Sequence, residues 1–176
     1  MTWTSFHRRG EVLRAVITEV DARRDGHLPM SVTGVSETFG DELTLLGALT
    51  LRWHTRLAGR IERELMNQPM DLEGAVIDAW QATAEELPGV LAILDRHRAE
   101  PLDDAMASAM AASTAKEHTL LAVMAGATSA RDERAARVGA QIAERARAAL
   151  APASQRVISP APASFVDRLR AVLHAA

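Results

Sequence analysis

Apolar residues recur every three or four positions along most of this chain, and Gly and Pro separate the stretches that carry this period. A spacing of three and four places the apolar side chains on one face of an α-helix. No segment shows the strict apolar–polar alternation of a half-buried β-strand. The sequence therefore predicts an all-α protein.

Five core helices account for most of the chain. We expect them over residues 3–24, 36–67, 71–97, 100–125 and 131–150. The 36–67 stretch is apolar over the widest arc, which is typical of the central helix of a bundle. The apolar phase of the third helix continues across Pro88, which favours a kink there, although a restart is the alternative. The predicted fold is an antiparallel four- to five-helix bundle.

The C-terminal part differs in composition from the first 150 residues. Residues 151–163 are rich in Pro, Ala and Ser, which is typical of a semi-rigid linker. Ser164 can then cap a short amphipathic helix, whose apolar face consists of Phe165, Leu169, Val172 and Leu173. We expect one domain over 1–150 and a linker with a tail helix over 151–176. This helix can pack on its own bundle or on a partner, and we expect the chain to form a homodimer that the tail helps to stabilise.

Composition excludes several classes of protein. The chain has no cysteine, which removes disulfides, thiol catalysis and Cys-based zinc sites. The net charge is −3 with both signs interspersed, whereas nucleic-acid-binding domains are clearly basic. No apolar run approaches the roughly 18–20 residues of a membrane span, and the N-terminus lacks a secretory signal pattern. The sequence predicts a cytoplasmic protein that binds neither nucleic acid nor membrane.

Familiar catalytic motifs do not occur. There is no Gly-rich phosphate loop, no GxSxG and no HExxH. No histidine follows a glutamate by three positions, which argues against a carboxylate-bridged di-iron site of the kind found in helical bundles. The sequence names no cofactor.

Polar residues on two apolar faces are the main anomaly. His54 lies at the centre of the arc of helix 36–67, and Glu117 at the centre of the face of helix 100–125. A buried carboxylate needs a partner or a raised pKa, so we expect both side chains to be buried and in direct or water-mediated contact. The pair either fixes helix register or forms part of a pocket for a small molecule or a metal. The candidate ligand-binding residues are Thr50, His54, Ser113, Glu117 and His118.

A row of arginines lies opposite the apolar arc of helix 36–67. The row consists of Arg52, Arg56, Arg60 and Arg63. Such a row is usually a solvated surface, here with Glu64, Glu85 or Glu86 as partners. Alternatively, four arginines on one face can bind the carboxylates of an acidic protein partner.

Two functions follow from these features. The leading hypothesis is a non-catalytic interaction or regulatory module that self-associates, because helix 131–150 buries little apolar area and the tail helix needs a surface. The alternative is a small-molecule- or metal-binding bundle, possibly an enzyme, with its site around His54, Ser113 and Glu117.

Overall fold

The computed structural model describes residues 3–129 and 133–150, with side chains from residue 7 onward. Within these residues the chain forms seven α-helices and no strand, so the all-α prediction is confirmed. The helices are α1 (Trp3–Arg23), α2 (Val35–Phe39), α3 (Glu42–Asn67), α4 (Leu72–Glu86), α5 (Pro88–Ala99), α6 (Asp104–Met124) and α7 (Glu133–Leu150). The predicted linker and tail helix, residues 151–176, lie outside the described residues.

A break at Gly40 divides the helix that was expected over residues 36–67. Gly40 has a φ of 78°, which is not helical, and it ends α2 after a short turn. Asp41 then caps α3, because its side chain accepts a hydrogen bond from the Thr44 backbone N–H at 2.7 Å. The prediction of one continuous helix was wrong here, since the Gly–Asp pair is itself a stop and a start signal.

Pro88 restarts the chain as a new helix rather than bending an old one. Leu87 leaves the helical conformation with a φ of −126°, and Pro88 opens α5 at the first helical position. The prediction of a kinked continuous helix was therefore wrong, and the alternative, a new helix that starts at Pro88, is correct. Gly89 lets α5 lie very close to α1, because a Cβ on this residue would lie 2.1 Å from the Val20 backbone.

The core lies on the inner faces of the long helices. On α3 it lies along the apolar arc and includes Trp53, Leu57 and Ile61, all fully buried. On α1 the core contains Val16, which is fully buried, while Leu13 and Ile17 are only partly buried. The largest buried side chains of α6 and α7 are Met106, Met110, Leu121 and Ile142.

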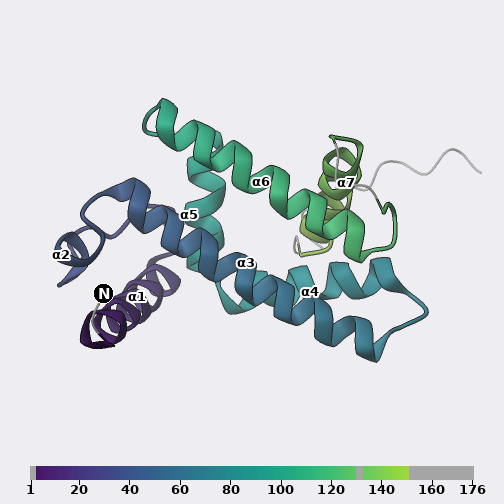
Figure 1. Cartoon of the computed structure of the whole chain (residues 1–176), viewed down its shortest axis with the longest axis horizontal. Helices are drawn as coiled ribbons and strands as arrows, with labels where there is room; N and C mark the ends of the chain where they lie inside the picture. Colours follow the sequence, from purple (N-terminus) through teal and green to yellow (C-terminus); the bar gives the residue numbers. More distant parts are fainter. Residues whose placement is uncertain (1–2, 130–132, 151–176) are drawn as a thin grey trace, which may run out of the picture.

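The helices do not all alternate in direction. Figure 1 shows α3 and α6 side by side and running the same way, with α4 returning along α3 and α7 crossing the second half of α6. The described helices thus form an all-α bundle in which α4 is antiparallel to α3, while α6 runs parallel to α3. At the α6–α7 crossing, a Cβ on Gly139 would lie 1.7 Å from the His118 carbonyl oxygen, so these two helices are in very close contact. None of the described helices combines the length and the apolar composition needed to cross a membrane.

Candidate functional site

Glu117 on α6 is the centre of the largest buried polar cluster in the described chain. Its side chain is only 2% exposed. The indole N–H groups of Trp53 and Trp80 donate hydrogen bonds to its two oxygens at 3.1 and 3.2 Å. The Arg98 guanidinium donates a third bond at 3.1 Å. Side chains from α3, α4 and α5 thus meet on one carboxylate of α6.

His54 approaches the same carboxylate, as the helical phases predicted. Its Nε2 lies 3.4 Å from Glu117 Oε2, so the predicted contact is confirmed. The alignment is too poor for a hydrogen bond, and the His54 side chain is 24% exposed. It lies at the edge of the buried face because the neighbouring Trp53 occupies the centre.

The surroundings of Glu117 keep it ionised. Burial alone would raise the pKa of this carboxyl group, because it disfavours the charged form. The adjacent His54 ring, the positive charge of Arg98 and the Trp80 indole oppose this effect and lower the pKa to about 2. Glu117 is therefore a poor general acid or base near neutral pH, because its pKa is far from the operating pH.

A second layer of charges completes the cluster. Arg98 also binds Asp95 at 3.0 Å, and Arg147 of α7 binds the same carboxylate at 2.7 Å. The Arg147 guanidinium lies 4.8 Å from the centre of the Trp80 ring, a cation–π contact. Two carboxylates and two guanidinium groups thus balance each other. This full set of partners indicates that Glu117 has mainly a structural role.

Sequence reasoning found Glu117 but missed most of its partners. Trp53 and Trp80 were not among the predicted polar residues, and their rings lie edge to face at 5.8 Å. A buried indole N–H usually needs an acceptor, which is the signal that could have linked both residues to the nearest buried carboxylate. No group of three or more His, Asp or Glu side chains within the described residues is arranged to hold a metal.

The predicted ligand-binding residues fall on two sides of α6, with Glu117 between them. His54, Thr50 and Ser113 line a groove of about 380 Å³ between α3 and α6. The Thr50 hydroxyl bonds to a backbone carbonyl of its own helix, and the Ser113 hydroxyl is buried without a hydrogen-bond partner in the described chain. His118 instead lines a pocket of about 510 Å³ between α5, α6 and α7, together with Thr114.

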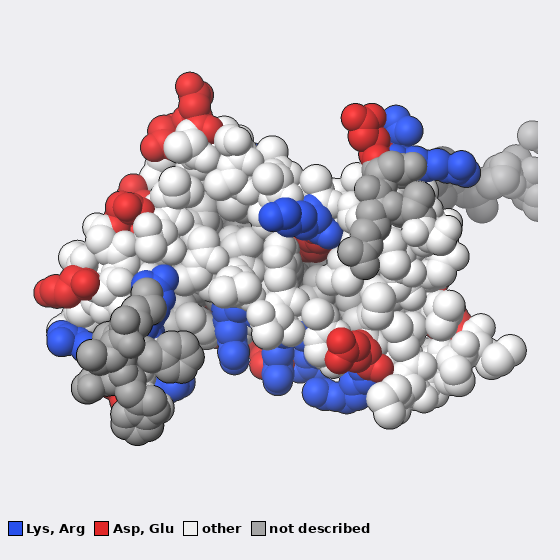
Figure 2. Space-filling view, viewed as in Figure 1, with Lys and Arg blue, Asp and Glu red and all other residues white. Residues whose placement is uncertain are grey.

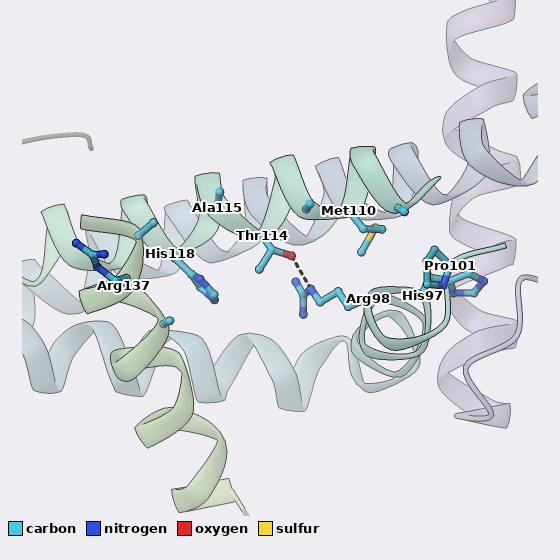
Figure 3. A pocket seen from close by; sticks show the side chains of 12 residues that line it. His97, Arg98, Pro101, Met110, Thr114, Ala115, His118 and Arg137 are labelled. Atoms are coloured by element: carbon cyan, nitrogen blue, oxygen red, sulfur yellow. Dashed lines mark hydrogen bonds between the residues drawn. The ribbon is translucent and has the colours of Figure 1, made fainter. Parts of the chain in front are cut away.

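Figure 3 shows this second pocket, which we call the α5–α6–α7 pocket. Arg98, Thr114 and His118 point into it from α5 and α6, and Arg137 lies at the α7 end. The Arg98 Nε donates to the Thr114 hydroxyl oxygen at 3.1 Å. Burial lowers the pKa of His118 below its ordinary value, so this ring is mainly neutral at pH 7. The residues that line the pocket include no acid.

A third hollow, the α1–α3 groove, lies at the other end of the molecule and has a volume of about 450 Å³. Gly10 and Leu13 of α1 form one wall, and Gly47, Leu51 and Arg52 of α3 contribute to the other. The Leu51 side chain is 67% exposed. No acidic residue lines this groove.

The arginine row of α3 is divided by its partners. Arg56 and Arg60 both bind Glu86 of α4, and they lower the pKa of this carboxyl group against the opposing effect of burial. Arg52 and Arg63 are exposed and make no ion pair within the described residues. Two of the four arginines in the row therefore have the expected acidic partner within the chain, namely Glu86.

Comparison with known proteins gives no relative whose role could be carried over. The chain matches no family model, no curated protein sequence and no solved structure. The hollows and charges described above are the basis for inferring a function.

Proposed function

We propose that this chain is a non-catalytic interaction module that binds an acidic amphipathic helix in the α1–α3 groove. The observation that carries this proposal is a pair of glycines, Gly10 and Gly47, which lie inside helices and line the groove. The occupant would be an apolar helix face with glutamate or aspartate at its flanks, a common mode of helix recognition.

Two glycines inside helices, Gly10 and Gly47, line this groove, whereas Gly59 of α3 is also uncovered but lies outside it. Glycine inside a helix costs about 0.5–1 kcal/mol relative to alanine, because the unfolded chain gains freedom. At Gly89 and Gly139 another helix backbone occupies the space of the missing Cβ. No such backbone covers Gly47, where nothing lies within 4 Å, or Gly10, where only the Arg14 side chain comes near. A helix from another chain, lying against Gly10 and Gly47, would account for both.

Apolar surface and charge around the groove support the same kind of occupant. Leu51 offers an exposed apolar anchor beside Gly47. Figure 2 shows basic side chains along the lower edge of the molecule, below α3. At the groove itself Arg52 has no ion pair within the described chain, whereas the Arg9 guanidinium is held 4.4 Å above the Phe39 ring. The free charge of Arg52 favours a partner with carboxylates.

The chemistry of the cluster supports a non-catalytic role. Glu117 is ionised, neutralised by Arg98 and bound by two indoles, so it has little capacity to transfer a proton. The alternative is a small-molecule or metal site centred on His54, Ser113 and Glu117. It is less favoured, because the Glu117 carboxylate is already bound by Arg98 and two indoles. The lack of cysteine means that the fold needs no disulfide, which supports the proposed location in the cytoplasm.

Self-association, which the sequence analysis favoured, stays a separate prediction. A two-fold pairing of α3 with the α3 of a second copy, centred on Leu51, would place the two Arg52 side chains near each other. Like charges at an interface disfavour such a pairing. We therefore propose a different chain as the occupant of the groove, with a dimer through this groove as the competing outcome.

Two labelled peptides test the proposal by fluorescence anisotropy. Both are amphipathic helices with a Leu and Ala face; one carries Glu at the flanks and the other carries Lys. We expect the full chain to bind the Glu peptide and not the Lys peptide. Gly47→Ala should weaken binding about tenfold by blocking backbone approach, and Arg52→Glu should weaken it by a similar factor.

Matched controls lie on the same helix. Gly59→Ala adds the same methyl group at a site where nothing lies within 4 Å, and Arg63→Glu reverses a second exposed charge without an ion pair in the described chain; neither residue lines the groove. Both controls should leave binding unchanged. Equal binding of the two peptides, or equal effects of Gly47→Ala and Gly59→Ala, would overturn the proposal. Sedimentation velocity adds a further check, because a dimer that Arg52→Glu alters would identify a second copy as the occupant.

A further inference from the structure

The α5–α6–α7 pocket carries one positive charge that the described chain does not balance. The Arg98 guanidinium binds the carboxylates of Asp95 and Glu117, and Arg147 binds Asp95 as well. These four charges cancel. Arg137 at the pocket is exposed, makes no ion pair within the described residues, and shares the lining with no acid. An anion is the ligand that would complete this arrangement.

Several hydrogen-bond donors in the pocket also lack an acceptor. The Thr114 oxygen accepts a bond from Arg98, but its own O–H donates to no atom of the described chain. The Arg98 terminal nitrogens have two N–H groups each, and the acceptors Asp95 and Glu117 use one on each nitrogen. His118 is partly buried and makes no hydrogen bond within the described residues. Figure 3 shows that Arg98, Thr114 and His118 point into the same space.

The rest of the pocket is apolar and lined by small side chains. Alanines of α6 and α7 line it, and Met110 lies towards the α5 end. The alanines are Ala107, Ala111 and Ala115 of α6 with Ala136 and Ala140 of α7. Small residues on both helices keep the space open, and its volume of about 510 Å³ lies within the range of small-molecule sites.

We propose that the α5–α6–α7 pocket binds a small organic carboxylate. The carboxylate would accept hydrogen bonds from Thr114, His118 and Arg137, and its apolar body would lie against the alanines of α6 and α7. A monoanion matches the single unbalanced charge of Arg137. This site is independent of the α1–α3 groove, because the two hollows share no residue.

Titration with hexanoate, followed through the His118 imidazole signals by NMR, tests the proposal on the full chain. Hexanol serves as the uncharged probe, and inorganic phosphate as the anion without an apolar body. We expect hexanoate to shift the His118 signals saturably. The other two probes should bind with at least tenfold lower affinity, because hexanol lacks the negative charge and phosphate lacks the apolar body. Arg137→Gln should weaken hexanoate binding about tenfold through the loss of a charge-assisted hydrogen bond.

Arg134→Gln is the matched control for Arg137→Gln. Arg134 is also exposed on α7, one turn earlier, and does not line the pocket. It should change hexanoate binding less than twofold, as expected for a distant surface charge. No saturable shift with hexanoate would overturn the proposal, as would equal binding of hexanol or phosphate, or equal effects of the two variants. Binding of the Glu peptide to the α1–α3 groove should be unaffected by Arg137→Gln, so the two proposals can fail separately.

Discussion

Glu117 binds one arginine and Glu86 binds two, in each case from another helix, but in very different surroundings. The Glu117 side chain is 2% exposed and receives one guanidinium and two indoles; the Glu86 side chain is 27% exposed and receives two guanidinium groups at the surface. The pKa of both carboxyl groups is lowered by these partners against the effect of burial. Water can replace the partners of Glu86, whereas the two indole partners of Glu117 are fully buried. The same pairing chemistry should therefore contribute very differently to stability.

Removal of each carboxylate is the strongest test of this comparison. We expect Glu117→Ala to lower the free energy of unfolding by about 3–5 kcal/mol, because Arg98 and two buried indoles lose their acceptor. Glu86→Ala should cost less than about 1 kcal/mol, as for other exposed ion pairs. Urea denaturation of both variants measures the difference. Equal losses would show that burial does not separate the two sites.

Two neighbouring residues of α3 sharpen the comparison within one helix. Leu57 is fully buried, whereas Arg56 faces Glu86 at the surface. Leu57→Ala should destabilise the fold by roughly 2–4 kcal/mol through the loss of core packing, and Ile61→Ala by a similar amount. Arg56→Ala should cost less than about 1 kcal/mol. An Arg56 effect as large as that of Leu57 would mean that the phase of α3 is inverted.

Acid unfolding tests the electrostatic side of the comparison. The pKa of Glu117 is about 2 in the folded protein and has an ordinary value of 4.5, so the unfolded state binds the proton more readily. The resulting stabilisation is complete above pH 4.5 and is lost as the pH falls towards 2. It amounts to roughly 3 kcal/mol, from about 1.4 kcal/mol for each pH unit. The stability difference between wild type and Glu117→Gln should shrink over this window; a constant difference would contradict the low pKa.

Two glycine-to-alanine substitutions should change the free energy of unfolding least, and in opposite directions. Gly47→Ala should raise the free energy of unfolding by about 0.5–1 kcal/mol, because no atom lies within 4 Å of the new methyl group. Gly139→Ala should instead lower it by about 1–3 kcal/mol, because the methyl group would collide with the His118 carbonyl and separate α6 from α7. Thermal melts of the two variants should shift in opposite directions. A Gly47→Ala variant that is less stable than wild type would mean that α3 is already covered at this position.

Helical phase predicted part of the candidate site. It identified Glu117 as buried and placed it beside His54, and the two lie 3.4 Å apart. It could not identify Arg98 or Trp80 as partners, because they belong to helices whose neighbours the period does not specify. It also placed His118 and His54 in one candidate site, but they line different hollows on two sides of α6. Helical phase cannot separate the two hollows, because residues at neighbouring edges of one helix face can border different spaces.

The sequence by itself determined the class of the fold, most of the inner face of α3 and the need of Glu117 for a partner. These are properties of single helices, because the apolar period and the cost of a buried charge depend on local spacing. Only the tertiary structure decided that α3 and α6 lie side by side, that Arg98 and two indoles bind Glu117, and that Gly47 is left uncovered. These features depend on which helices pack together, and that choice depends on the free energy of the whole core.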